Sequence, residues 1–191
     1  RSAPDTDFLT EMFQGKQFVG SFDGQGYALR NAVINRPTQD FVGIFGELGA
    51  GGQLLNLGVE AVSVTGLSRV GGLCGRNNGG TISVCHTTGS VTGTSETFST
   101  AGGLVGAINS NGTLLDSYSS CTVSGVARAG GLVGQLSFGE IRVCYATGDV
   151  TAPGEHVGGL VGIIYDPVNS STILNSYATG RVSGATNAGG L

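Results

Sequence analysis

The stretch Gly130-Gly131-Leu132-Val133-Gly134 decides the fold of this chain, because near copies of it recur along the sequence. Further copies occupy residues 71–75, 102–106 and 158–162, with a degenerate copy at 42–46 and an incomplete last one at 189–191. The glycine before the apolar residue falls at positions 43, 72, 103, 131, 159 and 190, so the spacings are 29, 31, 28, 28 and 31 residues. Such a period is typical of a solenoid, in which each unit buries its apolar face by stacking on its neighbours.

Composition favours strands and tight turns over helices. The 191 residues include 36 Gly and only 4 Pro, and charged residues make up 12%. Each unit is interpreted as the Gly-Gly-Leu-Val-Gly strand, a variable loop and a strand pair such as residues 141–150. We therefore predict an all-β fold, a parallel β-helix or β-solenoid of roughly six coils with about 28–31 residues per coil.

Aligned units place like residues in columns, as a parallel stack of coils requires. Successive coils of such a stack lie about 4.8 Å apart. An apolar column, an aromatic column and a valine column are expected: Ile82, Leu114, Ile141 and Ile173; His86, Tyr118, Tyr145 and Tyr177; Val91, Val123, Val150 and Val182. The small Cys or Ser column, three residues after the apolar one, breaks strict alternation, so a bend is expected at Asn175 and its equivalents.

The ends and the insertions depart from the repeat. Residues 1–17 are interpreted as an N-terminal leader or cap, with a short helical turn at 7–13, and residues 18–191 as the solenoid, truncated or continuing beyond 191. Strands at 18–22 and 27–34, around the turn Asp23-Gly24-Gln25-Gly26, are expected to make the first coil. The insertions at 94–99 and 165–170 are expected to project from one face or edge.

Charge and hydropathy restrict the partners. The net charge is −4 and the nine Lys and Arg residues are scattered singly, so we expect no nucleic acid partner. No stretch approaches the roughly 18 apolar residues of a membrane span, so no membrane insertion is expected. The expected partners are neighbouring coils or copies of the chain, stacked end to end, and surface glycans or proteins.

The four cysteines lack the spacing of a zinc or redox pair. They stand at 74, 85, 121 and 144. Cys85 and Cys144 share a column but lie two coils apart, which exceeds the roughly 7 Å limit on the Cα separation of a disulfide. We predict four unbridged thiols, with Cys74–Cys85 as the least implausible bridge.

Known catalytic patterns do not occur in this sequence. His86 and His156 stand apart from any partner at a recognised spacing, and the acidic residues form no carboxylate ladder. No phosphate-binding glycine loop occurs. We therefore predict no catalytic, cofactor-binding or metal-binding residues, and no cofactor.

Two features carry weaker functional predictions. Tyr118, Tyr145 and Tyr177 are predicted to stack, and their exposed faces could hold sugars. Asn111 and Asn169 each begin a sequon for N-glycosylation.

The sequence also resembles a known repeat. Gly-Gly-Leu-Val-Gly, then an Ile strand, then the segments 145–150 and 177–184 with the pattern Tyr-Ala-Thr-Gly-x-Val, are similar to the GLUG repeat of bacterial surface adhesins and of immunoglobulin A protease stalks. The chain departs from it at 42–46 and at Cys121, which occupies a glycine column. The resemblance implies a right-handed parallel β-helix or similar solenoid on a secreted or cell-surface protein, and no chemistry.

The sequence is consistent with three hypotheses for the function of the chain. The first is a non-enzymatic extracellular structural or adhesive segment: a stalk, an adhesin or the building block of a filament. The second is a β-helix that binds or cleaves glycans along one wall. The third is the stalk of a larger surface protease.

Overall fold

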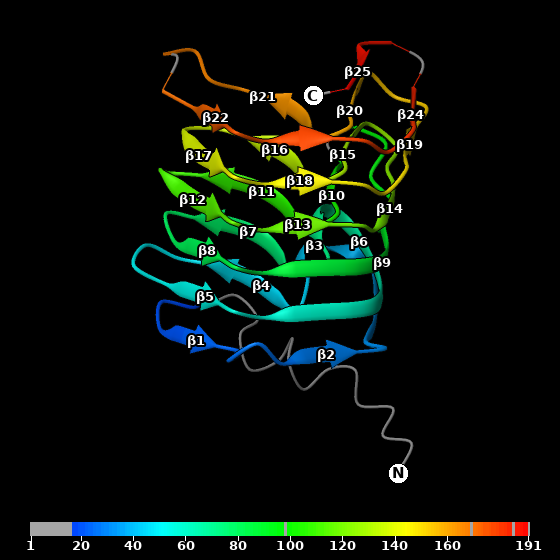
Figure 1. Cartoon of the computed structure of the whole chain (residues 1–191). Helices are drawn as coiled ribbons and strands as arrows, with labels where there is room; N and C mark the ends of the chain where they lie inside the picture. Colours follow the sequence, from blue (N-terminus) through cyan, green and yellow to red (C-terminus); the bar gives the residue numbers. More distant parts are fainter. Residues whose placement is uncertain (1–16, 98, 169, 185, 191) are drawn as a thin grey trace.

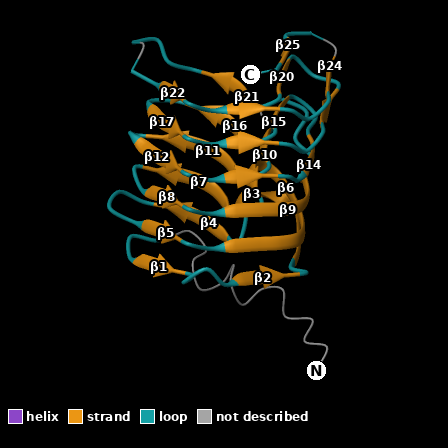
Figure 2. Cartoon of the chain, in the orientation of Figure 1, coloured by secondary structure: helices purple, strands orange, loops and turns teal. Residues whose placement is uncertain are grey.

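The computed structural model describes residues 17–97, 99–168, 170–184 and 186–190. Its described residues form parallel strands that wind into six stacked coils, with residues 21–30 in the coil at one end of the stack and residues 172–184 in the coil at the other (Figure 1). Strands joined by loops make up the whole of this part of the chain, without a helix (Figure 2). The predicted all-β solenoid is therefore confirmed. The predicted leader or cap and its helical turn lie outside the described residues, apart from Gln17.

Three parallel sheets form the walls of the stack. Each coil runs from the six-stranded sheet to the 14-stranded sheet and then to the five-stranded sheet. The six-stranded sheet contains β1 (Ser21–Asp23), β5 (Gln53–Leu55), β8 (Thr81–Ser83), β12 (Gly112–Leu115), β17 (Gly139–Arg142) and β22 (Thr172–Leu174). The five-stranded sheet contains β4 (Phe45–Leu48), β7 (Cys74–Asn78), β11 (Val105–Asn109), β16 (Val133–Leu136) and β21 (Val161–Ile164).

The 14-stranded sheet covers the longest part of each coil. Its longest strands, β3, β6 and β9, belong to the first three coils, and the later coils contribute only short strands. They are β2 (Ala28–Arg30), β3 (Val33–Val42), β6 (Gly58–Gly71), β9 (His86–Gly93), β10 (Thr100–Gly102), β13 (Tyr118–Ser119), β14 (Thr122–Ser124), β15 (Arg128–Gly130), β18 (Tyr145–Ala146), β19 (Val150–Ala152), β20 (His156–Gly158), β23 (Tyr177–Ala178), β24 (Val182–Gly184) and β25 (Ala188–Gly189).

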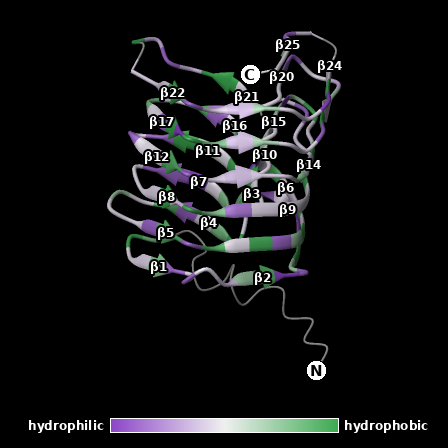
Figure 3. Ribbon diagram, in the orientation of Figure 1, coloured by the Kyte–Doolittle hydropathy of each residue, from purple (hydrophilic) through white to green (hydrophobic). Residues whose placement is uncertain are grey.

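The predicted columns are direct strand partners. Leu114 pairs with Ile82 on one side and Ile141 on the other, and all three side chains are fully buried. The valine and aromatic columns are paired in the same way. Hydrophobic and hydrophilic residues both occur on these strands, as expected when one face of a strand points inside (Figure 3). Burial of the Leu, Ile and Val columns stabilises the coils by about 25 cal/mol per Å² of apolar surface.

A bend does separate the apolar column from the aromatic column. The residues at this corner are Asn56, Val84, Asp116, Val143 and Asn175, with φ between 46° and 55°. Positive φ is common for Asn and Asp but strained for a β-branched residue. The adjacent coils hold the two valines in this conformation, because the residue before each valine is paired with a residue of the coil above and of the coil below. The N–H of each valine also donates to the next coil. The bend expected at Asn175 and its equivalents is confirmed.

The Gly-Gly-Leu-Val-Gly motif is not one strand, and that prediction is wrong. The motif lies across the corner between the 14-stranded and the five-stranded sheet: Gly130 ends β15, Gly131 and Leu132 make the bend, and Val133 begins β16. A Cβ on Gly131 would stand 2.2 Å from the carbonyl oxygen of Gly159 in the next coil. The glycine is needed because the coils approach there by their backbones, while Leu132 is fully buried inside.

The two insertions do not project from one edge, so that prediction is also wrong. The first, of which residues 94–97 and 99 are described, joins β9 to β10 within the 14-stranded sheet. The second, with residues 165–168 and 170 described, joins β21 of the five-stranded sheet to β22 of the six-stranded sheet. The two insertions lie at different places in the coil, because any loop between two strands of a coil can accept extra residues.

The predicted first coil is present, but its strands lie at 21–23, 28–30 and 33–42 and not at 18–22 and 27–34, and its turn is not a hairpin turn. β1 and β2, on either side of residues 24–27, do not pair with each other; each is parallel to the coil above, β1 to β5 and β2 to β6. The turn therefore lies at the corner of the coil.

Candidate functional site

A stack of aromatic rings is the most regular surface feature of the molecule. His86, Tyr118, Tyr145 and Tyr177 begin β9, β13, β18 and β23, so their side chains leave the 14-stranded sheet at the same position in successive coils. The ring centroids are 4.9, 4.8 and 5.3 Å apart, and the planes differ by 5°, 2° and 8°. We call these four residues the aromatic ladder. The predicted stacking is present, and the sugar-binding role of its tyrosines stays a prediction.

Stacking limits what the ladder can contact. Tyr118 and Tyr145 each have a ring against both faces, so they offer edges and hydroxyl groups to a ligand. Tyr177 is 53% exposed. Burial raises the pKa of Tyr145, and the neighbouring phenols Tyr118 and Tyr177 raise it further because adjacent phenolates would repel each other.

Below His86 the ladder has no ring. The residues paired with this position in the two coils below are Gly58 and Ala28. Nε2 of His86 lies 3.4 Å from Oε1 of Glu60, and Nε of Arg30 donates to Oε2 of the same carboxylate at 2.7 Å. The pKa of Glu60 is lowered by its hydrogen bonds to Arg30 and His86. Glu60 therefore joins the foot of the ladder to the first coil.

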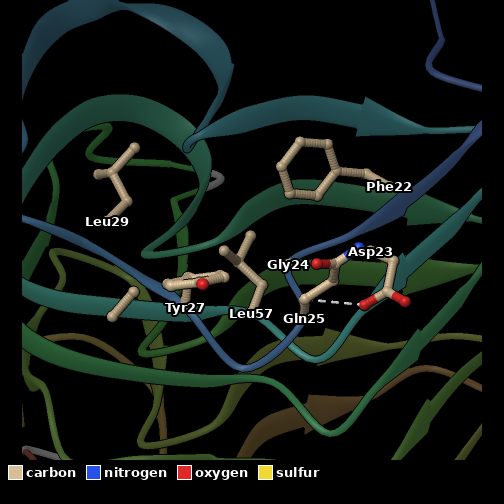
Figure 4. A pocket seen from close by; sticks show the side chains of 8 residues that line it. Phe22, Asp23, Gly24, Gln25, Tyr27, Leu29 and Leu57 are labelled. Atoms are coloured by element: carbon tan, nitrogen blue, oxygen red, sulfur yellow. Dashed lines mark hydrogen bonds between the residues drawn. The ribbon is translucent and has the colours of Figure 1, made fainter.

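Two shallow pockets open beside this foot. The pocket in Figure 4, of about 360 Å³, has Phe22, Tyr27, Leu29 and Leu57 around the turn at residues 23–26. Oδ1 of Asp23 accepts the backbone N–H of Gln25 at 2.8 Å, drawn as a dashed line, and Nδ2 of Asn56 at 3.0 Å. These bonds hold the turn and lower the pKa of Asp23. The second pocket, of about 470 Å³, lies between this turn and His86.

The four cysteines are unbridged and buried, as predicted. Burial raises the pKa of Cys74 to about 12 and the pKa of Cys85 and Cys144 to about 11. Since the thiolate is the reactive form, burial favours the unreactive thiol form of these residues in the folded chain. The pKa of Cys121 is raised for the same reason.

The column of Cys85 and Cys144 alternates with serines that carry hydrogen bonds. Oγ of Ser117 accepts the backbone N–H of Cys85 at 3.0 Å and donates to the carbonyl of Leu115. Ser176 makes the same pair of bonds to Cys144 and Leu174. These serine side chains form hydrogen bonds with backbone groups at the corner, where the residue with positive φ interrupts the backbone hydrogen bonds between coils.

One charged cluster was not foreseen from the sequence. The guanidinium carbons of Arg76 and Arg69 lie 4.4 and 5.0 Å from the ring centroid of Phe41. Arg76 donates from Nε to Glu47 at 2.8 Å, and Arg69 lies 3.5 Å from Asp40. Residues of opposite charge one period apart, such as Glu47 and Arg76, are the sequence feature from which this cluster could have been predicted. Each cation here has a carboxylate partner, so the cluster is structural.

The remaining predicted positions are isolated. Asn111 is exposed in the turn between β11 and β12, with φ of 63°, and Oγ1 of Thr113 donates to Thr81. Asn169 lies outside the described residues, and the glycosylation of both stays a prediction. Within the described ranges, no three His, Cys, Asp or Glu side chains gather as they would around a metal ion. The same ranges hold no helix long and apolar enough to span a membrane.

Comparison with known proteins agrees with the repeat. The GLUG motif matches residues 125–151 and 153–183. Halomucin from Haloquadratum walsbyi is 40% identical over 179 residues, which cover 91% of this chain and 2% of that protein. The chain thus spans a small part of the length of this relative. No solved structure matches. Residues 125–151 and 153–183 thus match the GLUG motif that the recurring glycine pattern resembles.

Proposed function

We propose that this chain is a non-enzymatic structural repeat segment of a secreted or cell-surface protein. The observation that carries the proposal is the unbroken register of the six-stranded sheet: equivalent residues are strand partners through all six coils, from Ser21 through Gln53, Thr81, Thr113 and Glu140 to Thr172. Such a stack can be lengthened by whole coils without a change in its core. The similarity to a segment of halomucin supports a place in a very long surface protein.

The geometry of the stack favours a stiff column over a long one. A coil of about 29 residues adds about 4.8 Å, which is much less per residue than an α-helix or an extended linker gives. Six coils rise only about 29 Å. The gain is a column that keeps its shape, because every coil is held by backbone hydrogen bonds and by a continuous apolar core. The partners that suit such a column are further coils of the same kind, stacked on its first or last coil.

The adhesive role is the alternative within the same class. It would use side chains that leave the walls, such as the aromatic ladder or the described residues of the two insertions. A structural role needs none of them. The two roles therefore differ in one measurable property, saturable binding of a ligand to the outer surface.

Tandem proteins test the structural role. A second copy of residues 45–191, joined directly after residue 191, takes up the glycine motif where the first copy leaves it and adds five coils. We expect one straight column that is about 24 Å longer, seen by small-angle X-ray scattering and electron microscopy, and no saturable binding to cells or glycans. Copies that tumble as separate beads, or saturable binding to a glycan array, would contradict the structural proposal.

A further inference from the structure

An apolar ridge runs along the corner between the six-stranded and the 14-stranded sheet. Two neighbouring columns of outward side chains form it, and the apolar residues change column from one coil to the next. Leucine occupies the first column in coils two, four and six, and valine occupies the second in coils three and five. We call these five residues the corner ridge: Leu55, Val84, Leu115, Val143 and Leu174. The other positions of the two columns hold polar residues: Asn56, Ser83, Asp116, Arg142 and Asn175.

The two valines of the ridge are not explained by the core of the column. Val84 and Val143 have φ of 55° and 54°, a conformation that strains a β-branched residue, whereas asparagine and aspartate adopt it readily. Their side chains are 53% and 48% exposed, so burial inside the column does not offset the strain. Strained residues cluster at functional sites. The two valines therefore indicate a contact with another molecule.

The repeat of the ridge indicates which partner fits it. Each step from one valine to the next takes two coils, about 9.6 Å. A molecule that contacts every step must repeat at the same distance, and a second column of this chain does. Apolar residues gathered on a protein surface are typical of such association sites. Because the ridge is narrow, the contact is weak for six coils and strengthens as coils are added.

An antiparallel pair of columns lets the two ridges interlock. A twofold axis between coils four and five places coil four level with coil five of the second copy, and coil three level with its coil six. Leu115 then lies opposite Arg142 of the second copy, and Val84 lies opposite Asn175 of the second copy. Each apolar side chain thus enters a gap between apolar residues of the other ridge, as knobs enter holes in a coiled coil.

The charged residues beside the ridge fit this arrangement. Asp116 is exposed and pairs with no cation of the described residues. The Arg142 side chain is 51% exposed and donates from Nε to Glu140 at 2.8 Å, which leaves Nη1 for a second acceptor. In the antiparallel pair, Arg142 of each copy lies level with Asp116 of the other, and its aliphatic stem lies over Leu115. The opposed charges therefore form two ion pairs between the copies.

We propose that the corner ridge is the surface through which two copies of this column associate side by side and antiparallel. The inference goes beyond the proposed structural role, because a single column keeps its shape without a lateral partner. It also differs from stacking on the first or last coil, since the ridge lies on the side of the column. Failure of this association leaves the tandem experiment on the structural role unaffected.

Sedimentation velocity and small-angle X-ray scattering of the chain, from about 10 µM to about 1 mM, test the proposal. We expect a dimer of unchanged length and larger cross-section. Val84→Asn combined with Val143→Asn should raise the Kd about tenfold or more. The urea midpoint of this variant should not fall, because asparagine adopts the positive φ without strain. Ser124→Asn combined with Thr151→Asn, at exposed paired positions of the 14-stranded sheet, should dimerise as the parent chain does.

A charge exchange tests the antiparallel register. Asp116→Arg and Arg142→Asp should each weaken association alone, because like charges then face each other, and an equimolar mixture of the two should associate as tightly as the parent chain. Arginine is tolerated at positive φ in this fold, since Arg69 has φ of 51°. The proposal is overturned if the chain stays monomeric at about 1 mM, if the dimer is longer than one column, if the double asparagine variant dimerises as the parent does, or if the mixture associates no more tightly than each variant alone.

Discussion

The second glycine of the repeated motif offers a matched pair of substitutions, Gly131→Ala and Gly190→Ala. Both glycines stand at the same position of the motif. A Cβ at Gly131 would stand 2.2 Å from the carbonyl oxygen of Gly159 and 2.9 Å from Cβ of Ala146. A Cβ at Gly190 would meet nothing within 4 Å. The same chemical change therefore produces a clash in the fourth coil and none in the last.

The cost at Gly131 follows from the contacts around it. Both obstructing atoms belong to neighbouring coils, so relief requires the coils to separate locally by about 1 Å. Gly131, Leu132 and Val133 donate hydrogen bonds of 3.2, 3.0 and 3.1 Å to the next coil at this place. Overpacking costs about 1–3 kcal/mol and each weakened hydrogen bond about 1 kcal/mol. We expect Gly131→Ala to lower the free energy of unfolding by about 3–5 kcal/mol, and Gly190→Ala to change it by less than about 0.5 kcal/mol.

Urea denaturation followed by far-ultraviolet circular dichroism measures both changes. The slope of the free energy against urea concentration shows whether the stack still unfolds as one unit in each variant. Equal stability of Gly131→Ala and the parent chain would refute the argument that backbone approach between coils requires this glycine. An equal loss in Gly190→Ala would refute it as well, because a Cβ at that position meets no atom within 4 Å.

Three other changes test separate parts of the structure. Ser117→Ala leaves the N–H of Cys85 without its acceptor and should lower the free energy of unfolding, measured by urea denaturation, by about 1–3 kcal/mol. Cys144→Ser places in this column the residue already present at Ser117 and Ser176, and should lower the free energy of unfolding by less than about 1.5 kcal/mol. The four buried thiols should react with Ellman's reagent at pH 8 only after denaturant is added, and labelling of the native chain would contradict their burial. The free energy of unfolding should fall as the pH rises from about 8.5 towards 12, because the unfolded chain loses thiol and phenol protons at lower pH than the folded chain. In the folded chain the pKa of Cys74 is raised to about 12, and the pKa of Tyr145 is also raised. Tyr145→Phe should make the fall shallower, and a free energy of unfolding that rises over this range would contradict the assigned shifts.

The fold class and the strand register could be predicted from the sequence because the structure repeats itself in units of one coil. A strand residue is paired with the residue one period away, so aligning the repeats also pairs the strands, except where the register shifts between β3 and β6 and between β6 and β9. Leu114 with Ile82, and Tyr145 with Tyr118, follow at once. The bend at Asn175 followed from the break in alternation, and its equivalents Val84 and Val143 share it because the register forces the same conformation on them.

The path of the backbone within one coil could not be read in the same way. The Gly-Gly-Leu-Val-Gly motif has the apolar content of a strand, yet it crosses a corner. Its glycines are required by close backbone contacts with the adjacent coils, and not by their neighbours in sequence. The direction in which the insertions leave the stack depends on which corner carries them. Sequence periodicity thus gave the register and the bend at Asn175, but not the corner at the glycine motif.

The foot of the aromatic ladder was missed for a related reason. The alignment places Gly58 under His86, but a missing side chain carries no chemical signal of its own. Glu60 and Arg30 are one period apart and of opposite charge, which indicates their contact. That Glu60 also reaches across to His86, in the next coil, depends on side-chain length and on the twist of the wall, which only the structure shows.

The distance between the two ends of one column tests the solenoid most directly. Ser21 and Thr172 are both exposed and are joined by five strand pairings, so their Cα atoms should lie about 24 Å apart. Spin labels at these two positions allow the distance to be measured by double electron–electron resonance. Deletion of residues 103–130, which splices Gly102 to Gly131 and removes one coil, should shorten it to about 19 Å. An unchanged distance, or a broad distribution in either protein, would contradict a stack of coils in register.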